Sequence, residues 1–181
     1  MKTIAGVIAA SAGTLLAFLV EQALPSIGFL HGARLLLIPM VFCYAAMILP
    51  LPAVLALAGF TGLLTDLANL HVIDGRVEIA VGWSIVFYVI FGLISHGLQN
   101  AMLRGHWWPF ILLSGLGTAA LPLLQLVMIS FRREGFVFDS VCVWRILAPG
   151  MIAMLLAPFL HHAVKPFSGL FPEEDLLPRD Y

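Results

Sequence analysis

The longest uncharged stretch of the chain limits its fold more than any other feature. Residues 35–65 contain no Asp, Glu, Lys or Arg over 31 positions. One helix needs about 20 residues to cross about 30 Å of hydrocarbon, so this run is too long for a single crossing. Pro50 and Pro52 divide it, because proline disfavours a helical conformation at the residue before it. The run predicts two short membrane helices joined by a tight turn at residues 49–52, with a kink at Pro39 in the first helix.

The composition is that of an integral membrane protein. Hydrophobic residues make up 61% of the chain and charged residues 10%, against about 25% charged in a soluble domain. The length of 181 residues leaves room for about six spans. We therefore predict an all-α polytopic membrane protein with about six transmembrane helices in one domain, residues 1–165, followed by a flexible acidic tail containing proline, residues 166–181. The net charge of −1 and the scattered basic residues indicate no nucleic-acid partner.

Alternating crossings gather most of the charged helix ends on one side of the membrane. The ends of odd spans and the starts of even spans share a face, and this face receives Glu21, Arg34, Asp66 and Arg145. When both arginines are set aside because they lie at or within helices, the remaining Lys and Arg residues favour the opposite side as the cytoplasmic one. The sequence predicts cytoplasmic termini, N-in and C-in, with the charged face outside the cytoplasm.

Two predicted helices carry faces of small residues. Ala58, Gly62 and Asp66 follow one another at steps of four, and Gly59 lies three before Gly62, so all four share one side of a helix. Small residues let helix backbones approach closely in lipid, and this face turns the Asp66 carboxylate toward a protein neighbour. In residues 3–20 a second stripe favours a packed first span over a cleavable signal peptide; it consists of Gly6, Ala10, Gly13 and Ala17. Both faces are predicted to pack against other helices or a partner.

The four charges on the outer face allow two interpretations. Charges in or beside spans usually pair with one another or line a cavity, so Glu21, Arg34, Asp66 and Arg145 can form a polar pocket or partner site. Alternatively they are interfacial charges that hold helix ends in register or extend toward the headgroups. Arg145, about five residues inside its predicted span, is expected to be the most deeply buried of the four. The sequence leaves both interpretations open.

Residues for enzyme chemistry or metal binding do not form a recognisable pattern. We find no nucleophile with a plausible base, no glycine-rich phosphate loop and no paired acids at a catalytic spacing. Only two cysteines are present, and His161 and His162 are adjacent, so their side chains diverge by about 100° on a helix. His96 and His106 are read as interfacial in the same way. We predict no enzyme activity, no catalytic residues, no cofactor and no metal site.

The order of these features resembles the rod shape-determining membrane protein MreD family. A basic residue opens a short second helix, Arg34-Leu35-Leu36-Leu37-Ile38, and the proline turn follows. Next comes Gly59-Phe60-Thr61-Gly62-Leu63-Leu64-Thr65-Asp66-Leu67, then a loop with Gly75 and a long span. The similarity covers residues 28–164 and is best over residues 34–98. It implies a nonenzymatic component of the cell-wall (peptidoglycan) elongation machinery that determines cell shape in the bacterial inner membrane.

The resemblance also implies partners. A member of this family is expected to bind MreC, a single-span protein, and through it the MreB filament and the wall synthases. The mechanism we expect is lateral helix packing in the lipid bilayer, with the faces at Gly59 and Gly62 accepting a partner helix. The charged outer rim would then meet the partner's juxtamembrane segment.

A second function of another class also fits the sequence. Chains of this kind are similar in size and span count to the substrate-binding subunits of energy-coupling-factor vitamin transporters. On that hypothesis the charge cluster is a small-molecule site, and the stripe on the first span meets the transport module. Ligand-dependent thermal stabilisation of the purified protein would distinguish the two functions.

Overall fold

The computed structural model describes residues 2–25, 34–69, 72–73, 76–77, 82–132 and 140–164. These residues are helical apart from short connections and one small hairpin. The helices are α1 (Lys2–Ala23), α2 (Ile38–Ala46), α3 (Leu51–Ala68), α4 (Trp83–Gly97), α5 (Gln99–Leu103), α6 (Trp108–Arg132) and α7 (Ser140–Val164). The antiparallel hairpin pairs β1 (Val72–Ile73) with β2 (Arg76–Val77), aligning Val72 with Val77. The predicted tail, residues 166–181, lies outside the described residues.

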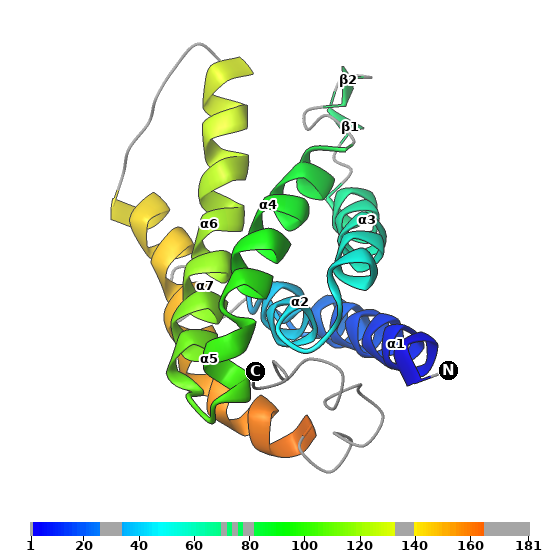
Figure 1. Cartoon of the computed structure of the whole chain (residues 1–181). Helices are drawn as coiled ribbons and strands as arrows, with labels where there is room; N and C mark the ends of the chain where they lie inside the picture. The colour runs from blue at the N-terminus through cyan, green and yellow to red at the C-terminus, as the bar shows by residue number, and fades with distance from the viewer. Residues whose placement is uncertain are drawn as a thin grey trace.

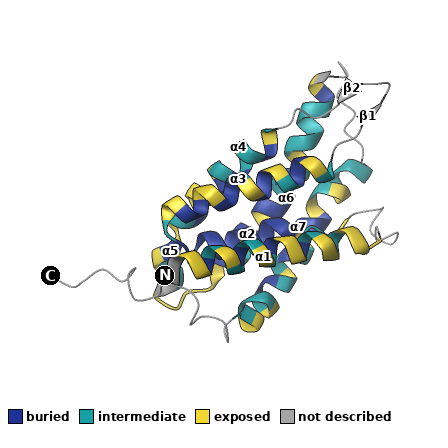
Figure 2. Ribbon diagram, turned by 90° about the vertical axis from the view of Figure 1, so that its right-hand side faces the viewer, coloured by how far each residue is buried: buried dark blue, intermediate teal, exposed yellow. Residues whose placement is uncertain are grey.

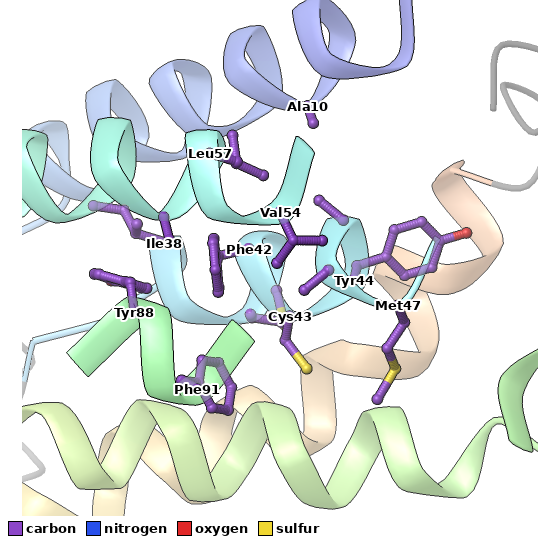
Figure 3. Packing of buried hydrophobic residues seen from close by; sticks show 14 of the residues in the cluster. Ala10, Ile38, Phe42, Cys43, Tyr44, Met47, Val54, Leu57, Tyr88 and Phe91 are labelled. Atoms are coloured by element: carbon purple, nitrogen blue, oxygen red, sulfur yellow. The ribbon is translucent and has the colours of Figure 1, made fainter. Parts of the chain in front are cut away.

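The short helix α2 occupies the centre of the fold. It contacts α1, α3, α4, α6 and α7, and Figure 1 shows it between α6 and α7 on the left and α3 on the right. Phe42 on α2 packs against Tyr88 of α4, with ring centroids 5.0 Å apart, and Tyr44 packs against Phe110 of α6 at 5.3 Å. Figure 3 shows α2 enclosed in this way by side chains of its neighbours. Burial on all sides explains why α2 is apolar all round rather than amphipathic.

Prolines set both ends of α2. Pro39 lies in its first turn, where a missing N–H costs no hydrogen bond, and the helix ends at Ala46 before the turn at Pro50. The predicted turn is present, but it lies at residues 47–50 rather than 49–52, because Pro50 is the N-cap of α3 and Pro52 lies in the first turn of that helix. The predicted kink at Pro39 is wrong, because residues 34–37 are not helical and α2 begins just before this proline.

Four helices are long and apolar enough to cross a membrane. They cover Ile4–Ala23, Leu51–Ala68, Trp108–Phe131 and Val141–Val164, and they indicate a membrane protein. The predicted all-helical class therefore holds, but the remaining two predicted spans correspond to shorter elements. α4 has 15 residues, and α2 has 9, which reach only about 14 Å. A span count of six and the orientation stay predictions.

Two close helix pairs flank α2. The α3–α4 pair and the α6–α7 pair have the most extensive contacts in the described chain. In the second pair a Cβ on Gly150 would lie 2.8 Å from the carbonyl oxygen of Gly115 and 3.0 Å from the Cβ of Ala119. Figure 2 shows that buried residues line the inner sides of the helices while exposed residues face outward, notably along α1. Glycine and alanine at the contacts let these backbones approach closely.

Candidate functional site

One side of α3 packs within the chain. Ala58 is fully buried, and a Cβ added to Gly62 would lie 2.5 Å from the Cα and 2.6 Å from the amide nitrogen of Ile85 on α4. The neighbour is backbone, which cannot rotate away as a side chain can. Ala58, Gly62 and Asp66 therefore form what we call the inner α3 face, and α4 covers Gly62 and Asp66 on it.

Asp66 lies at the end of the inner α3 face and binds the start of α4. Its carboxylate accepts hydrogen bonds from the amide of Gly82 at 2.6 Å and the amide of Ser84 at 3.3 Å. Gly82 has φ +103°, a left-handed conformation that a side chain disfavours. A carboxylate at a helix N-terminus satisfies free N–H groups and interacts favourably with the helix dipole. The predicted protein neighbour of Asp66 is thus the N-terminus of α4.

Gly59 points elsewhere, although it is only three residues before Gly62. A Cβ on Gly59 would meet no atom within 4 Å. It belongs to a row at steps of four with Leu55, Leu63 and Leu67, whose exposed fractions are 40%, 46% and 55%. We call these four residues the outer α3 face. The four residues predicted to share one partner face are therefore divided between two faces.

The small residues of α1 face the interior. Gly6, Ala10 and Ala17 are buried, and a Cβ on Gly13 would lie 3.8 Å from Val41 Cγ1 on α2. The stripe packs as predicted, but the neighbours of α1 in the described structure are α2 and α3 of the same chain. The opposite side of α1 is exposed, with Ile4, Ile8, Leu16 and Leu19 between 57% and 67% exposed.

A small polar cavity lies where α1, α3, α4 and α6 meet residues 34–39. We call this cavity the polar pocket. Its volume is about 40 Å³, and its polar lining consists of Glu21, Gln22, Arg34, Thr65, Asn69, Tyr88 and Gln125. A volume of this size holds a few water molecules at most, since one water molecule needs about 10–15 Å³.

Hydrogen bonds hold the walls of the polar pocket. The amide of Leu37 donates to Glu21 Oε2 at 3.2 Å, so the carboxylate on α1 satisfies a free N–H before α2. Thr65 Oγ1 donates to the carbonyl oxygen of Thr61 at 2.9 Å and lies 3.4 Å from the hydroxyl of Tyr88. The Asn69 amide donates to the carbonyl oxygen of Thr65 at 2.9 Å. The pocket is thus built from fixed side chains on several elements.

The structure brings together only part of the predicted charge cluster. Glu21 and Arg34 line the polar pocket, whereas Asp66 binds α4 and Arg145 is not among the lining residues. Arg145 is exposed, contrary to the expectation that it would be the most deeply buried of the four. Arg145 lies only five residues after Ser140, the first residue of α7. A long charged side chain near a helix end can extend toward water while its aliphatic part stays on the apolar surface, which explains the exposure of Arg145.

The pocket contains polar residues that the sequence analysis did not select. Tyr88 is fully buried, Gln125 lies in the part of α6 that has no charged residue before Arg132, and Gln22 follows Glu21. A polar side chain inside a membrane helix faces the protein interior or a cavity, so Gln125 and Tyr88 carried a usable signal. Their convergence with Glu21, about a hundred positions from Gln125, had no local signal.

Two apolar grooves open on the lateral surface. One, of about 400 Å³, lies between α4 and α6 and includes Trp83, Ile90 and Leu116. The other, of about 460 Å³, lies over α2 between α1 and α7 and includes Gly13, Val20, Leu37 and Leu160. We call the second one the α1–α7 groove. Both are the kind of surface that acyl chains or a further helix can cover in a membrane.

Comparisons of the chain with models of protein families, with curated proteins and with solved structures found no match. Within the described residues no group of three or more His, Cys, Asp or Glu side chains is placed to hold a metal ion. The arrangement offers packing faces, lateral grooves and one small polar pocket.

Proposed function

We propose that the chain is a nonenzymatic scaffold of the cell-wall elongation machinery in the bacterial inner membrane. It binds an MreC-type single-span partner by helix packing and is linked through that partner to the MreB filament and the wall synthases. The resemblance of residues 34–98 to the MreD family supports this proposal. In this proposal α2 and α4 are two shorter membrane crossings, both termini are cytoplasmic, and the polar pocket faces the side of the membrane opposite the cytoplasm.

A short second crossing is compatible with the dimensions of a bilayer. The four residues 34–37 add at most about 14 Å to the about 14 Å of α2, close to the about 30 Å of the hydrocarbon core. Irregular backbone at membrane depth is tolerated where protein buries it. Here the amide of Leu37 is bound by Glu21, and α2 is surrounded by five helices.

The observation that carries the scaffold proposal is the open space at Gly59. In lipid, helices associate through close packing, and a glycine among leucines gives a partner backbone its point of nearest approach. The outer α3 face provides such a point on an exposed surface, with Leu55 and Leu63 on either side. The space beside Gly62, by contrast, is filled by the backbone of α4. We therefore narrow the predicted partner face to Gly59.

The small volume of the polar pocket favours the scaffold function over the vitamin-binding alternative. Sites for small organic molecules have volumes of about 300–1,000 Å³. The cavity lined by Glu21 and Arg34 has about 40 Å³, which is too small for a vitamin. A vitamin that raises the thermal stability of the purified protein would contradict this preference.

The scaffold proposal is tested by copurification with an MreC-type partner. Gly59→Leu is expected to reduce recovery of the partner at least tenfold, because the larger side chain separates the two helix backbones. Gly97→Leu is a matched control, since a Cβ on Gly97 also meets no atom within 4 Å and this glycine lies at the end of α4. Full recovery with a stably inserted Gly59→Leu protein would refute the partner face. Failure of the unaltered chain to recover the partner would refute the scaffold itself.

A further inference from the structure

The polar pocket contains one acid and one base at different depths. Glu21 is half-buried and hydrogen-bonded through Oε2 to the Leu37 amide, whereas Arg34 is exposed at the rim. Arg34 attracts the Glu21 carboxylate electrostatically. The fully buried Tyr88 and the partly buried Gln125 also line the pocket. A ligand that suits this arrangement has a positive group inside and a negative group outside.

The α1–α7 groove begins beside this pocket. Val20 lines the groove and Glu21 lines the pocket; likewise Leu37 lines the groove and Leu36 the pocket. The polar pocket and the α1–α7 groove are therefore adjacent in two chain segments, at residues 20–21 and at residues 36–37. The groove then follows α1 as far as Ala9, a distance of about 16 Å along the helix. A polar site at the end of a long apolar groove fits a molecule with a charged head and an acyl chain.

We propose that the pocket and the α1–α7 groove bind one membrane phospholipid with a zwitterionic, primary-ammonium headgroup, of the phosphatidylethanolamine class. The ammonium enters the pocket and donates hydrogen bonds to the Glu21 carboxylate and to neighbouring amide or hydroxyl oxygens. The phosphate remains at the rim with Arg34, and an acyl chain lies in the groove. Each charge of the headgroup then meets the opposite charge of the protein.

The pocket distinguishes a primary ammonium from its methylated forms. An ammonium has three N–H donors and is close to a water molecule in size, so it suits a cavity of about 40 Å³ with several oxygen acceptors. A trimethylammonium group has no donor and is larger. A glycerol headgroup brings no positive charge to the Glu21 carboxylate. Hydrogen bonds between oppositely charged groups are stronger than neutral ones, so selectivity for the primary ammonium follows.

The test measures lipid selectivity of the full chain in detergent by native mass spectrometry. Dioleoyl phosphatidylethanolamine competes in turn with its N-methyl and N,N-dimethyl derivatives, with phosphatidylcholine and with phosphatidylglycerol. We expect about a tenfold preference for phosphatidylethanolamine over phosphatidylcholine, as for one charge-assisted hydrogen bond, with the methylated lipids between them. Equal retention of all five lipids overturns the proposal and means a nonspecific annulus. This series needs no protein variant.

Three variants locate the site. Glu21→Gln keeps an acceptor for the Leu37 amide but removes the charge, and it is expected to abolish the preference. Arg34→Gln is expected to weaken phosphatidylethanolamine and phosphatidylcholine alike, because both carry the phosphate. Arg145→Gln, an exposed arginine that does not line the pocket, should leave the preference unchanged. A preference that survives Glu21→Gln, or is lost in Arg145→Gln, overturns the site. No partner protein takes part, so failure here leaves the scaffold proposal standing.

Discussion

Gly59 and Gly62 lie on the same helix, three positions apart, and have opposite surroundings. Gly62 is pressed against the backbone of α4 at Ile85, whereas Gly59 opens onto empty space beside exposed leucines. Both looked alike in the sequence, as small residues on one helix face. The difference teaches that a small-residue pattern indicates close packing but not the identity of the neighbour. Gly62 lets α3 pack against α4 of this chain, and Gly59 is the point at which we propose that a partner helix packs.

The largest effect on stability is expected for a substitution at Gly62, on the inner α3 face. Gly62→Leu should destabilise the protein by more than about 3 kcal/mol, because the new side chain meets backbone atoms that cannot move without separating α3 from α4. The measurement is thermal unfolding and size-exclusion behaviour of the purified protein. A monodisperse Gly62→Leu protein with unchanged unfolding temperature would show that α3 and α4 do not meet at this point.

The next effect concerns the carboxylate that ends the same face. Asp66→Ala should cost about 1–3 kcal/mol, since the amides of Gly82 and Ser84 lose a charged acceptor at the start of α4. Asp66→Asn should cost less, because its amide oxygen still accepts a hydrogen bond. Hydrogen exchange at residues 82–86 should accelerate in the order wild type, Asn, Ala. Equal exchange in all three proteins would contradict the capping role.

Substituting a glycine that packs against a flexible side chain should lower the free energy of unfolding by less. A Cβ on Gly115 would meet the Met154 side chain rather than backbone, and methionine has rotatable bonds that let it move. Gly115→Ala is therefore expected to cost about 1 kcal/mol, and Gly62→Ala distinctly more. The free energies of unfolding of the two variants in the same detergent measure this. The reverse order would mean that backbone contact does not govern these costs.

The smallest effect on stability is expected for a substitution at Gly59, on the outer α3 face. Gly59→Leu should change the free energy of unfolding by no more than about 0.5 kcal/mol, since its side chain enters open space. Partner recovery should nevertheless fall. Unfolding and copurification measured on the same preparation separate the two outcomes. A large loss of stability would show that Gly59 is already packed inside the chain.

The sequence predicted the features of this fold that depend on nearby residues. Pro50 and Pro52 gave the turn between α2 and α3, and the spacing of Gly6, Ala10, Gly13 and Ala17 gave the inward side of α1. The carboxylate of Asp66 also meets a protein neighbour, as expected for an acid in a membrane helix.

Features that depend on distant residues were not predictable. The central position of α2 among five helices depends on long-range packing, which no local pattern records. The hairpin of β1 and β2 has two residues in each strand, too few for a periodic signal. The polar pocket requires Glu21 and Gln125 to meet across the fold, and Arg145 stays outside it. Long-range packing, rather than local spacing, decides which charges come together.

Cysteine labelling of two adjacent α3 positions tests the division of this helix most directly. In a chain with Cys43 and Cys142 replaced by alanine, Ala58→Cys and Gly59→Cys are treated with a lipid-soluble thiol reagent. Ala58 is fully buried and Gly59 opens outward, so the cysteine at 59 should react and the one at 58 should be protected. Coexpression of the partner should then protect position 59 as well. Equal labelling of both positions, or faster reaction at 58, would contradict the separate inner and outer faces of α3.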